Sequence, residues 1–230
     1  FDQIQGVDFV DTFSPVAKIN TVKALLAIAA AQDLFLEQMD VSNAFLHGDL
    51  NEEVYLRIPA GLDAPPGTCL KLRKSLYGLK QASRQWFAKL TNALLRYGFQ
   101  QTSSDYSLFV KDSGRSQVIL LVYVDDIILA GKDIDLIKAV KCYLHQQFKI
   151  KDLGELKYFL GLEIARSRHG IVMNQRKYCV ELLTDTGFLE AKGSKSPMDV
   201  NLRLSAKQGE PMEDPSMYRT LVGRLHYLTI

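Results

Sequence analysis

The chain has 230 residues, of which 47% are hydrophobic and 23% charged, enough for one large domain or two small lobes with a proper core. A net charge of +2 does not by itself indicate a polyanionic partner. Three isolated cysteines without CxxC spacing argue against a disulfide framework and a zinc site, and they favour a reducing compartment. We find no signal peptide and no membrane-spanning pattern, so we expect no membrane partner. Because the chain starts at Phe1 without an initiator methionine, we expect it to be a piece of a longer protein.

Positive charge is concentrated in one stretch, which we call the basic block. Between Thr68 and Gln100 the chain has seven Lys or Arg residues and no Asp or Glu. Such a block is often the solvated face of a helix, and it is also typical of a surface that faces phosphates. Both interpretations stay open at this point. The basic block consists of Lys71, Arg73, Lys74, Lys80, Arg84, Lys89 and Arg96.

The first half of the chain alternates helical and strand patterns. Ser14 can cap a helix that has Pro15 at its first position, and a stronger apolar period runs from residue 21 to residue 32. Residues 53–59 alternate apolar and polar side chains, as in a half-buried strand. The other elements expected here are strands over 34–39, 69–72 and 106–111, a loop over 64–67, and a helix that ends at Tyr97 before a capping Gly98.

The second half begins with a β-hairpin over residues 118–131. Asp133 then caps a helix whose apolar positions recur at helical spacing. A second hairpin is expected over 160–175, with its turn at 168–170. The chain continues with a predicted helix over 176–186, an irregular stretch over 190–215 and a final amphipathic helix capped by Asp214 and Pro215.

The first hairpin carries two adjacent carboxylates. Apolar runs rich in β-branched residues flank Asp125 and Asp126, and because Asp is depleted in strands, the pair should sit at the tip of the hairpin. The first of these strands is apolar on both faces, which predicts a central strand covered on both sides. Since side chains alternate along a strand, we expect Asp125 to follow Tyr123 onto one face and Asp126 to reach its target from the turn.

Two interpretations of this acidic pair compete: a solvated turn and a divalent-metal site. A metal site needs a further carboxylate at the end of a neighbouring strand, and Asp40 ends the apolar strand over 34–39. Strands and helices in this order can build an α+β fold with one antiparallel sheet backed by helices. That arrangement would place Asp40, Asp125 and Asp126 together at one edge, and three hard oxygen ligands suit Mg²⁺ shared with substrate phosphates.

Tyr123-Val-Asp-Asp126 between apolar strands resembles the polymerase signature of reverse transcriptases. Nearly the whole chain is similar to the copia type, which long-terminal-repeat retrotransposons encode within polyproteins. A single motif of this length is weak support, whereas seven blocks in the right order are strong support. The seven blocks are Phe13–Ala17, Met39–Gly48, Glu53–Tyr55, Ser75–Ser83, Tyr123–Gly131, Asp152–Gly161 and Leu221–Leu228.

The resemblance implies a right-hand polymerase fold. Residues 1–175 would form the fingers and palm, and residues 176–230 the beginning of a truncated thumb. We expect the family's basic strand, which would precede Phe1, and an RNase H region to lie outside these 230 residues. Within the first segment the fingers would cover approximately 1–15 and 48–80, and the palm approximately 16–47 and 81–175.

The resemblance also implies an activity, namely RNA-directed and DNA-directed DNA polymerisation with two Mg²⁺ ions, or Mn²⁺ as an alternative. Asp40, Asp125 and Asp126 would be catalytic and bind the metals together with Val41. Phe45 would be the steric gate that refuses a ribose 2′-hydroxyl. The dNTP would contact Val41, Ala44, Phe45, Gly78 and Lys80, and the template and primer would contact Tyr123, Phe159, Leu160, Gly161, Gly223 and Arg224.

Several alternatives stay open. Phe45 can instead be a core aromatic and Lys80 a solvated lysine, while Lys149, Lys151 and Lys157 all qualify as the proton donor to pyrophosphate. The implied partners are an RNA template, a DNA primer, their hybrid, dNTPs and the integrase and RNase H regions of the same polyprotein, in cytoplasmic virus-like particles. The competing functions are another palm-type nucleotidyl transferase and a catalytically inactive, truncated retroelement fragment that only binds nucleic acid through the basic block.

Overall fold

A computed structural model describes residues 3–114, 116–199, 201–205 and 209–229. The chain divides into two compact units, Phe1–Leu156 and Lys157–Ile230, and each is described here by itself. The antiparallel sheet with accompanying helices confirms the expected mixed α and β class. The predicted limits of fingers, palm and thumb are functional assignments and stay predictions.

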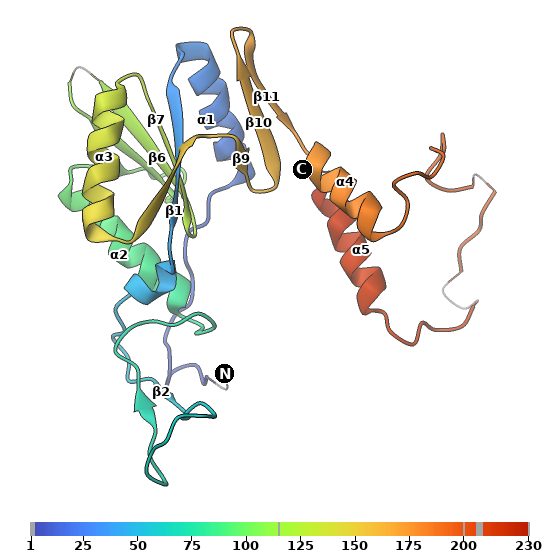
Figure 1. Ribbon diagram of the computed structural model, residues 1–230. Coiled ribbons are helices and arrows are strands. Elements are labelled where there is room, and N and C mark those ends of the chain that lie inside the picture. Colours follow the sequence, from blue (N-terminus) through green and yellow to red (C-terminus); the bar gives the residue numbers. More distant parts are fainter. Residues whose placement is uncertain (1–2, 115, 200, 206–208, 230) are drawn as a thin grey trace. The chain divides into compact units, whose positions relative to one another are not determined.

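In the described part of the first unit, six strands form one antiparallel sheet (Figure 1). The hairpin strands β6 and β7 are central, and the apolar character of β6 on both faces predicted this position for β6. Each strand in the order β4-β5-β6-β7-β1-β8 pairs antiparallel with its neighbour. The strands are β4 (Gln100–Gln101), β5 (Leu108–Asp112), β6 (Gln117–Tyr123), β7 (Asp126–Gly131), β1 (Phe35–Val41) and β8 (Ile150–Glu155).

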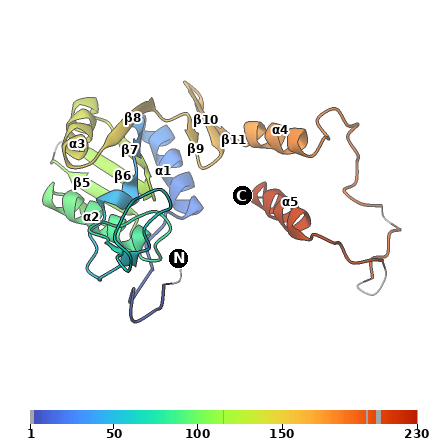
Figure 2. The ribbon, with the colours of Figure 1, turned by 60° about the horizontal axis from the view of Figure 1, so that its bottom comes forward.

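Helices cover both faces of this sheet (Figures 1 and 2). Helices α2 (Ala82–Arg96) and α3 (Ile134–Gln147) pack on one face, and α1 (Ile19–Gln32) contacts β7 from the other. The main core lies between the sheet and α2 and α3. Its fully buried members include Met39, Trp86, Leu90, Leu94, Phe109, Leu120, Ile127, Leu129 and Ile137.

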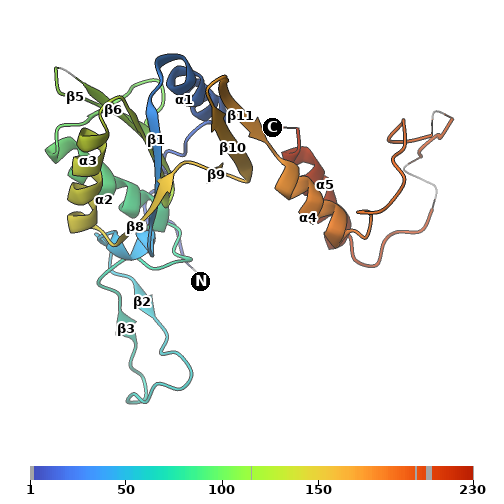
Figure 3. The ribbon, with the colours of Figure 1, turned by 45° about the horizontal axis from the view of Figure 1, so that its top comes forward.

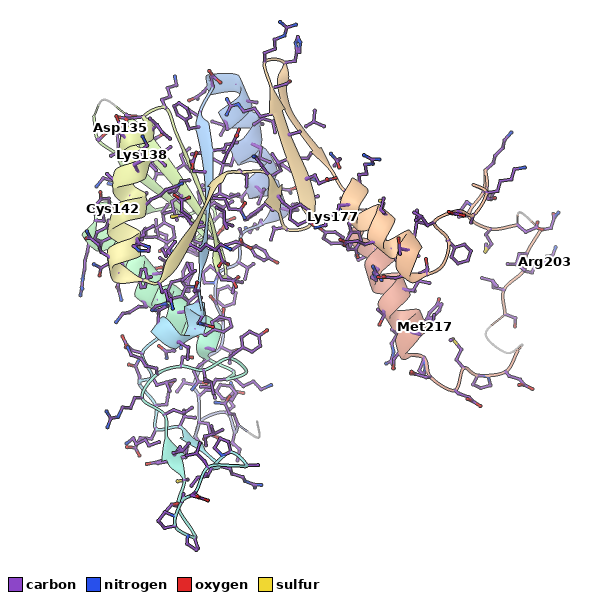
Figure 4. The ribbon with its side chains drawn as sticks, viewed as in Figure 1. Asp135, Lys138, Cys142, Lys177, Arg203 and Met217 are labelled. Carbon is purple, nitrogen blue, oxygen red and sulfur yellow. The ribbon has the colours of Figure 1, made fainter. Side chains whose placement is uncertain are left out.

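Helix α3 follows the sequence pattern closely. The Asp133 carboxylate caps it by accepting hydrogen bonds from the backbone N–H groups of Asp135 and Leu136, at 2.9 and 3.1 Å. Asp135, Lys138 and Cys142 project from the outer side of the helix (Figure 4). Its predicted apolar positions Ile137, Val140, Leu144 and Phe148 are all buried.

Strand β8 was not predicted, because its residues are mostly polar and exposed. It is an edge strand paired with β1, and the register shifts between Gln38 and Met39. Lys141 of α3 links β8 to β1. Its ammonium donates to Glu37 of β1 at 2.5 Å and to Asp152 of β8 at 2.6 Å. Tertiary contacts therefore define this strand, and local hydrophobic periodicity does not.

The ribbon of β2 (Tyr55–Leu56) and β3 (Leu70–Lys71) projects from the sheet of the first unit (Figure 3). The predicted strand over 53–59 is wrong in extent, since only two of its residues pair. Val54 is nevertheless buried, against Leu79 and Ala82.

The described part of the second unit contains a small sheet and two helices. Strands β9 (Tyr158–Phe159), β10 (Leu162–Ser167) and β11 (Gly170–Asn174) pair antiparallel in that order, which confirms the predicted hairpin and its turn. Helices α4 (Arg176–Asp185) and α5 (Ser216–Tyr227) agree with the predicted helices. Along the residues that the structure describes, no helix combines the length and apolar character needed to cross a membrane.

The predicted helix start at Ser14 and Pro15 is wrong, because the helix begins at Ile19. Its first turn is capped from another part of the chain by Asp105, which is only 7% exposed. The Asp105 carboxylate accepts hydrogen bonds from the Thr21 hydroxyl at 2.6 Å and from the Lys18 backbone N–H at 3.2 Å. Burial raises the pKa of Asp105, but its hydrogen bonds from Ser107, Thr21 and Lys18 outweigh this and hold the pKa below the ordinary value of 3.8.

We expect Asp105→Asn to lower the free energy of unfolding by about 1–3 kcal/mol at pH 7, because it removes a charged acceptor of several hydrogen bonds. The folded pKa of Asp105 lies below the unfolded value, so its contribution is complete above about pH 5 and is lost as the pH falls through the folded pKa. Urea unfolding at pH 7 and at about pH 2.5 measures the difference. Asp63→Asn, in an exposed loop, is the control. An equal difference in the free energy of unfolding between the wild type and Asp105→Asn at both pH values would contradict this role.

Candidate active site

The hairpin turn between β6 and β7 carries the acidic pair. Val124 and Asp125 form the turn, and Asp126 is the first residue of β7, opposite Tyr123 in the register. The expectation that Asp125 shares the face of Tyr123 while Asp126 extends from the turn is therefore wrong. Val124 has a φ of 57°, in the left-handed region, which interrupts the alternation of side chains. As a result Asp126 resumes the face of Tyr123, and Asp125 is exposed in the turn.

Asp40 lies beside this pair, as predicted. Strand β1 pairs with β7 so that Asp40 stands directly opposite Asp126. The neighbours of Asp40 in the strand, Met39 and Val41, point into the core under α2 and α3, so Asp40 points to the other face. The structure therefore brings the three predicted carboxylates to one end of the sheet, on β1, in the turn and on β7.

Burial raises the pKa of Asp126 above its ordinary value. The negative charges of Asp125 and Asp40 raise it further, and a hydrogen bond from the Gln38 amide at 3.2 Å acts in the opposite direction. Gln38 lies on β1 two residues before Asp40, and it is buried. The site thus places three negative charges close together, and the Gln38 amide partly offsets their repulsion by donating a hydrogen bond to Asp126.

The donor set fits a divalent cation, although its oxygens do not form a finished ligand cluster. Within the described ranges, none of the three carboxylates forms an ion pair with Lys, Arg or His. Among the same residues, no group of three or more His, Cys, Asp or Glu side chains is arranged to hold a metal ion. Carboxylate oxygens are the ligands that Mg²⁺ and Mn²⁺ prefer, so the chemistry of this donor set fits such a cation.

A cavity of about 350 Å³ opens beside Asp125. Phe45 lies on the 3₁₀ helix η1 (Ala44–His47), and its ring contacts that of Tyr77, with centroids 5.5 Å apart. Tyr77 is 81% exposed, and the motif analysis did not single it out as a site residue. The lining residues are Asn43, Ala44, Phe45, Leu46, Leu76, Tyr77, Val124 and Asp125.

The other residues predicted to contact a dNTP lie outside the described lining of this cavity. Val41 is buried, and its backbone N–H donates to the Asp125 carbonyl at 2.9 Å. Gly78 has a φ of 97°, which glycine adopts readily. The Lys80 side chain is exposed, while its backbone N–H donates to the Gln3 side chain at 2.7 Å.

Packing beneath the turn involves residues that motif matching did not identify. The Trp86 indole N–H of α2 donates to the Val124 carbonyl at 2.7 Å. Its ring lies edge-on to Phe148, with centroids 5.1 Å apart, and 5.8 Å from the ring of His47. The position of Trp86 on the apolar face of α2 predicted burial, but its hydrogen bond depends on a partner 38 residues away.

In the second unit, the residues predicted to contact the primer form a tight turn. Leu160 and Gly161 connect β9 to β10 with φ values of 51° and 76°, as in a type I′ turn, and Phe159 is buried. The Tyr227 hydroxyl of α5 donates to the Leu160 carbonyl. A Cβ on Gly161 would lie 2.5 Å from that hydroxyl, and the φ of Gly161 is one that other residues rarely adopt, so glycine is favoured at this position.

The two residues of α5 that were predicted to contact the template and primer differ in their surroundings. Gly223 of α5 is exposed, with open space around it. The Arg224 guanidinium forms an ion pair with Asp185 of α4 at 2.9 Å and lies 5.8 Å from the centre of the Tyr178 ring. Leu225, the next residue of α5, is 50% exposed.

The basic block is partly neutralised by carboxylates from outside it. Asp49 pairs with Lys74 and with Lys89, and the latter distance is 2.5 Å. Lys71 pairs with Glu53 and Arg84 with Asp11. Arg73, Lys80 and Arg96 have no ion pair within the described part of the chain. The surface available to phosphate is therefore smaller than the sequence suggests.

Comparison with known proteins decides the family. Residues 1–200 match the family model described as reverse transcriptase (RNA-dependent DNA polymerase). The chain belongs to this family. It is 44% identical over 231 residues to the retrovirus-related Pol polyprotein from transposon RE1 of Arabidopsis thaliana, and 38% identical over 243 residues to that from transposon TNT 1-94 of Nicotiana tabacum. These matches confirm the copia-type resemblance. No solved structure matches the chain.

The reverse transcriptase chain spans about one sixth of the length of these relatives. The alignment with the Arabidopsis polyprotein covers 99% of this chain and 16% of that polyprotein. The alignment with the tobacco polyprotein covers 100% of this chain and 18% of that polyprotein. A shorter relative, the putative transposon Ty5-1 protein YCL074W of Saccharomyces cerevisiae, is 28% identical over 190 residues, with 81% of this chain and 62% of that protein aligned.

We expect Gly48→Ala to lower the free energy of unfolding by about 1–3 kcal/mol, because overpacking displaces backbone. The added Cβ would lie 2.9 Å from the Trp86 backbone nitrogen and 3.1 Å from the Gln85 carbonyl carbon. Urea unfolding measures the loss. Gly193→Ala, where the Cβ would meet open space, is the matched control. Equal stability of the two variants would show that η1 does not press on α2.

Proposed function

We propose that this chain is an RNA-directed and DNA-directed DNA polymerase that transfers nucleotides from dNTPs to a primer 3′-hydroxyl. The observation that carries the proposal is the end of the central sheet, where Asp40 stands opposite Asp126 and Asp125 follows in the turn. Among the described residues none of the three has an ion-pair partner, and Asp125 also lines the cavity of Phe45 and Tyr77. Reverse transcription of retrotransposon RNA is the role that family membership supports.

Asp40, Asp125 and Asp126 would hold two Mg²⁺ ions, with Mn²⁺ as an alternative, and the backbone of Val41 lies close enough to the turn to contribute. When bound, such cations favour the deprotonated 3′-hydroxyl and stabilise the charge on the departing pyrophosphate. The protein's own contribution is positional: β1 and β7 fix Asp40 against Asp126, and the turn presents Asp125 to the cavity.

The cavity would receive the incoming dNTP. Phe45 lies on η1, which directly follows β1, and it lines the same cavity as Asp125. Its ring would exclude a ribose 2′-hydroxyl by contact with the sugar. Ala44 lines the same cavity, and Gly78 and Lys80 follow Tyr77 on the adjoining loop. The Lys80 ammonium, which has no ion pair among the described residues, would attract the triphosphate. An aromatic gate argues against a palm-type enzyme that uses rNTPs.

The template and primer would contact residues of both units. We propose the right-hand arrangement of fingers, palm and thumb, in which Tyr123 and the turn at Phe159, Leu160 and Gly161 position the primer, and Gly223 and Arg224 approach the duplex. The nucleic-acid partners would be an RNA template, a DNA primer and their hybrid. Integrase and RNase H regions of a common polyprotein, and cytoplasmic virus-like particles, complete the proposal.

A second function remains a candidate because Arg73, Lys80 and Arg96 are cations without an ion pair in the described residues. A chain that only binds nucleic acid would use such residues on phosphates. Its binding would weaken steeply with salt and would not require Mg²⁺. Incorporation of dNTPs that requires Mg²⁺ would exclude this function.

We expect Asp125→Asn to reduce primer extension on an RNA template by more than about a hundredfold, because it removes a charged metal ligand. The measurement is Mg²⁺-dependent dNTP incorporation. Asp112→Asn, at the exposed end of β5, should retain the wild-type rate. Wild-type protein without incorporation in either Mg²⁺ or Mn²⁺ would overturn the polymerase proposal, whereas an unaffected Asp125→Asn would overturn the site.

We expect Phe45→Val to reduce discrimination between dNTPs and rNTPs by about 10- to 100-fold, since a smaller side chain leaves room for the 2′-hydroxyl. The ratio of kcat/KM for dCTP and CTP measures this. Phe87→Leu is the control, because Phe87 packs against Phe109 outside the cavity. If both variants discriminate as the wild type does, Phe45 is a packing residue only.

A further inference from the structure

Trp86 is the single tryptophan of the chain, and its side chain is 1% exposed. It lies on α2, on the side of the sheet opposite to Asp40 and Asp126. Its indole N–H donates to the Val124 carbonyl at 2.7 Å, so a core residue makes a directed contact with the turn that carries Asp125. A buried indole N–H requires such a partner, and here the partner is a backbone atom of the site.

The Val124 conformation requires support. Its φ of 57° is rare for a β-branched residue, and such conformations persist only where the surroundings enforce them. Both carbonyls of the turn are fixed by hydrogen bonds: that of Val124 by the Trp86 indole, and that of Asp125 by the Val41 backbone N–H at 2.9 Å. With both peptide planes held, the direction of the Asp125 side chain is restricted.

The indole itself has little freedom. Phe148 lies edge-on to it at 5.1 Å, His47 lies at 5.8 Å, and these two rings contact one another at 5.5 Å. The α2 backbone at Trp86 is so close to Gly48 that a Cβ there would lie 2.9 Å from it. A rigid aromatic cluster therefore stands behind the hydrogen bond.

We propose that Trp86 is a positioning residue: its indole N–H holds the turn at Val124 so that Asp125 is set for a divalent cation. This deepens the proposed function and rests on it. Removing the N–H should increase the mobility of the turn while leaving the ring in the core. The increase should be larger at Asp125 than in the strands of the sheet.

The test replaces the N–H with minimal change of shape. Because the chain has one tryptophan, biosynthetic substitution by β-(3-benzothienyl)alanine, with sulfur in place of the N–H, alters position 86 alone. Trp86→Phe is the second variant. Phe87→Leu is the matched control, since Phe87 lies on the same helix and contacts Phe109 rather than the turn.

The first readout is amide hydrogen exchange, which needs no polymerisation. The Val41 amide, bonded to the turn, should exchange about tenfold faster in both position-86 variants, while the Leu129 amide in the sheet centre keeps its rate. In Phe87→Leu the two amides should change together. Equal behaviour of all three variants would overturn the proposal.

The second readout is the Mg²⁺ dependence of primer extension. Both position-86 variants should need about fivefold more Mg²⁺ for half-maximal incorporation and show a lower kcat, with the KM for dNTP nearly unchanged. Phe87→Leu should keep the wild-type Mg²⁺ dependence. An unchanged Mg²⁺ requirement in an active, folded position-86 variant would overturn the positioning role while leaving the polymerase proposal intact.

If the position-86 variants do not fold, the proposal can still be tested on the Trp86 indole of the wild-type protein. The single indole N–H resonance of the wild type should shift saturably with Mg²⁺ alone and should not shift in Asp125→Asn. Absence of that shift would overturn the proposal. If the shift and the exchange differences occur but the wild type never incorporates dNTPs, the polymerase assignment fails while the coupling of Trp86 to the turn stands.

Discussion

The pairing of β1 with β7 is the interaction on which the site depends. Its register sets Asp40 opposite Asp126 and, by alternation, buries Met39 and Val41 under α2 and α3. A slip by one residue would place Asp40 in the apolar core and expose Met39, which would cost far more than the stability of one pair of strands. The hydrophobic pattern of β1 thus specifies where the first carboxylate stands.

This arrangement places three carboxylates close together, and their repulsion is unfavourable. Burial and two neighbouring carboxylates raise the pKa of Asp126, and the Gln38 amide offsets only part of this. Such a site persists because the sheet beneath it is buried on both faces, so relaxation of the backbone would expose the core. A rigid support that keeps like charges together is a physical basis for cation affinity, since a bound cation relieves repulsion that the fold maintains.

Local signals in the sequence predicted the elements that local interactions define. The β6–β7 hairpin, the cap of α3 by Asp133 and the apolar face of α2 follow from composition and periodicity. The start of α1 could not be predicted in this way, because its capping residue Asp105 lies 87 residues from Lys18 in the sequence. Strand β8 could not be predicted either, because an edge strand can be polar and then lacks a hydrophobic pattern.

Within the site the same distinction applies. The three acids and the Phe45 position were predicted from motif and pattern, whereas the face of Asp126 was predicted wrongly. Strict alternation fails where Val124 adopts a positive φ, and that conformation depends on the tertiary bond to Trp86. The carboxylates are therefore held by the rigid sheet, whereas Tyr77 forms a more exposed wall of the cavity. The loop side of the cavity can change without disturbing the carboxylates, because the register of β1 and β7 does not involve it.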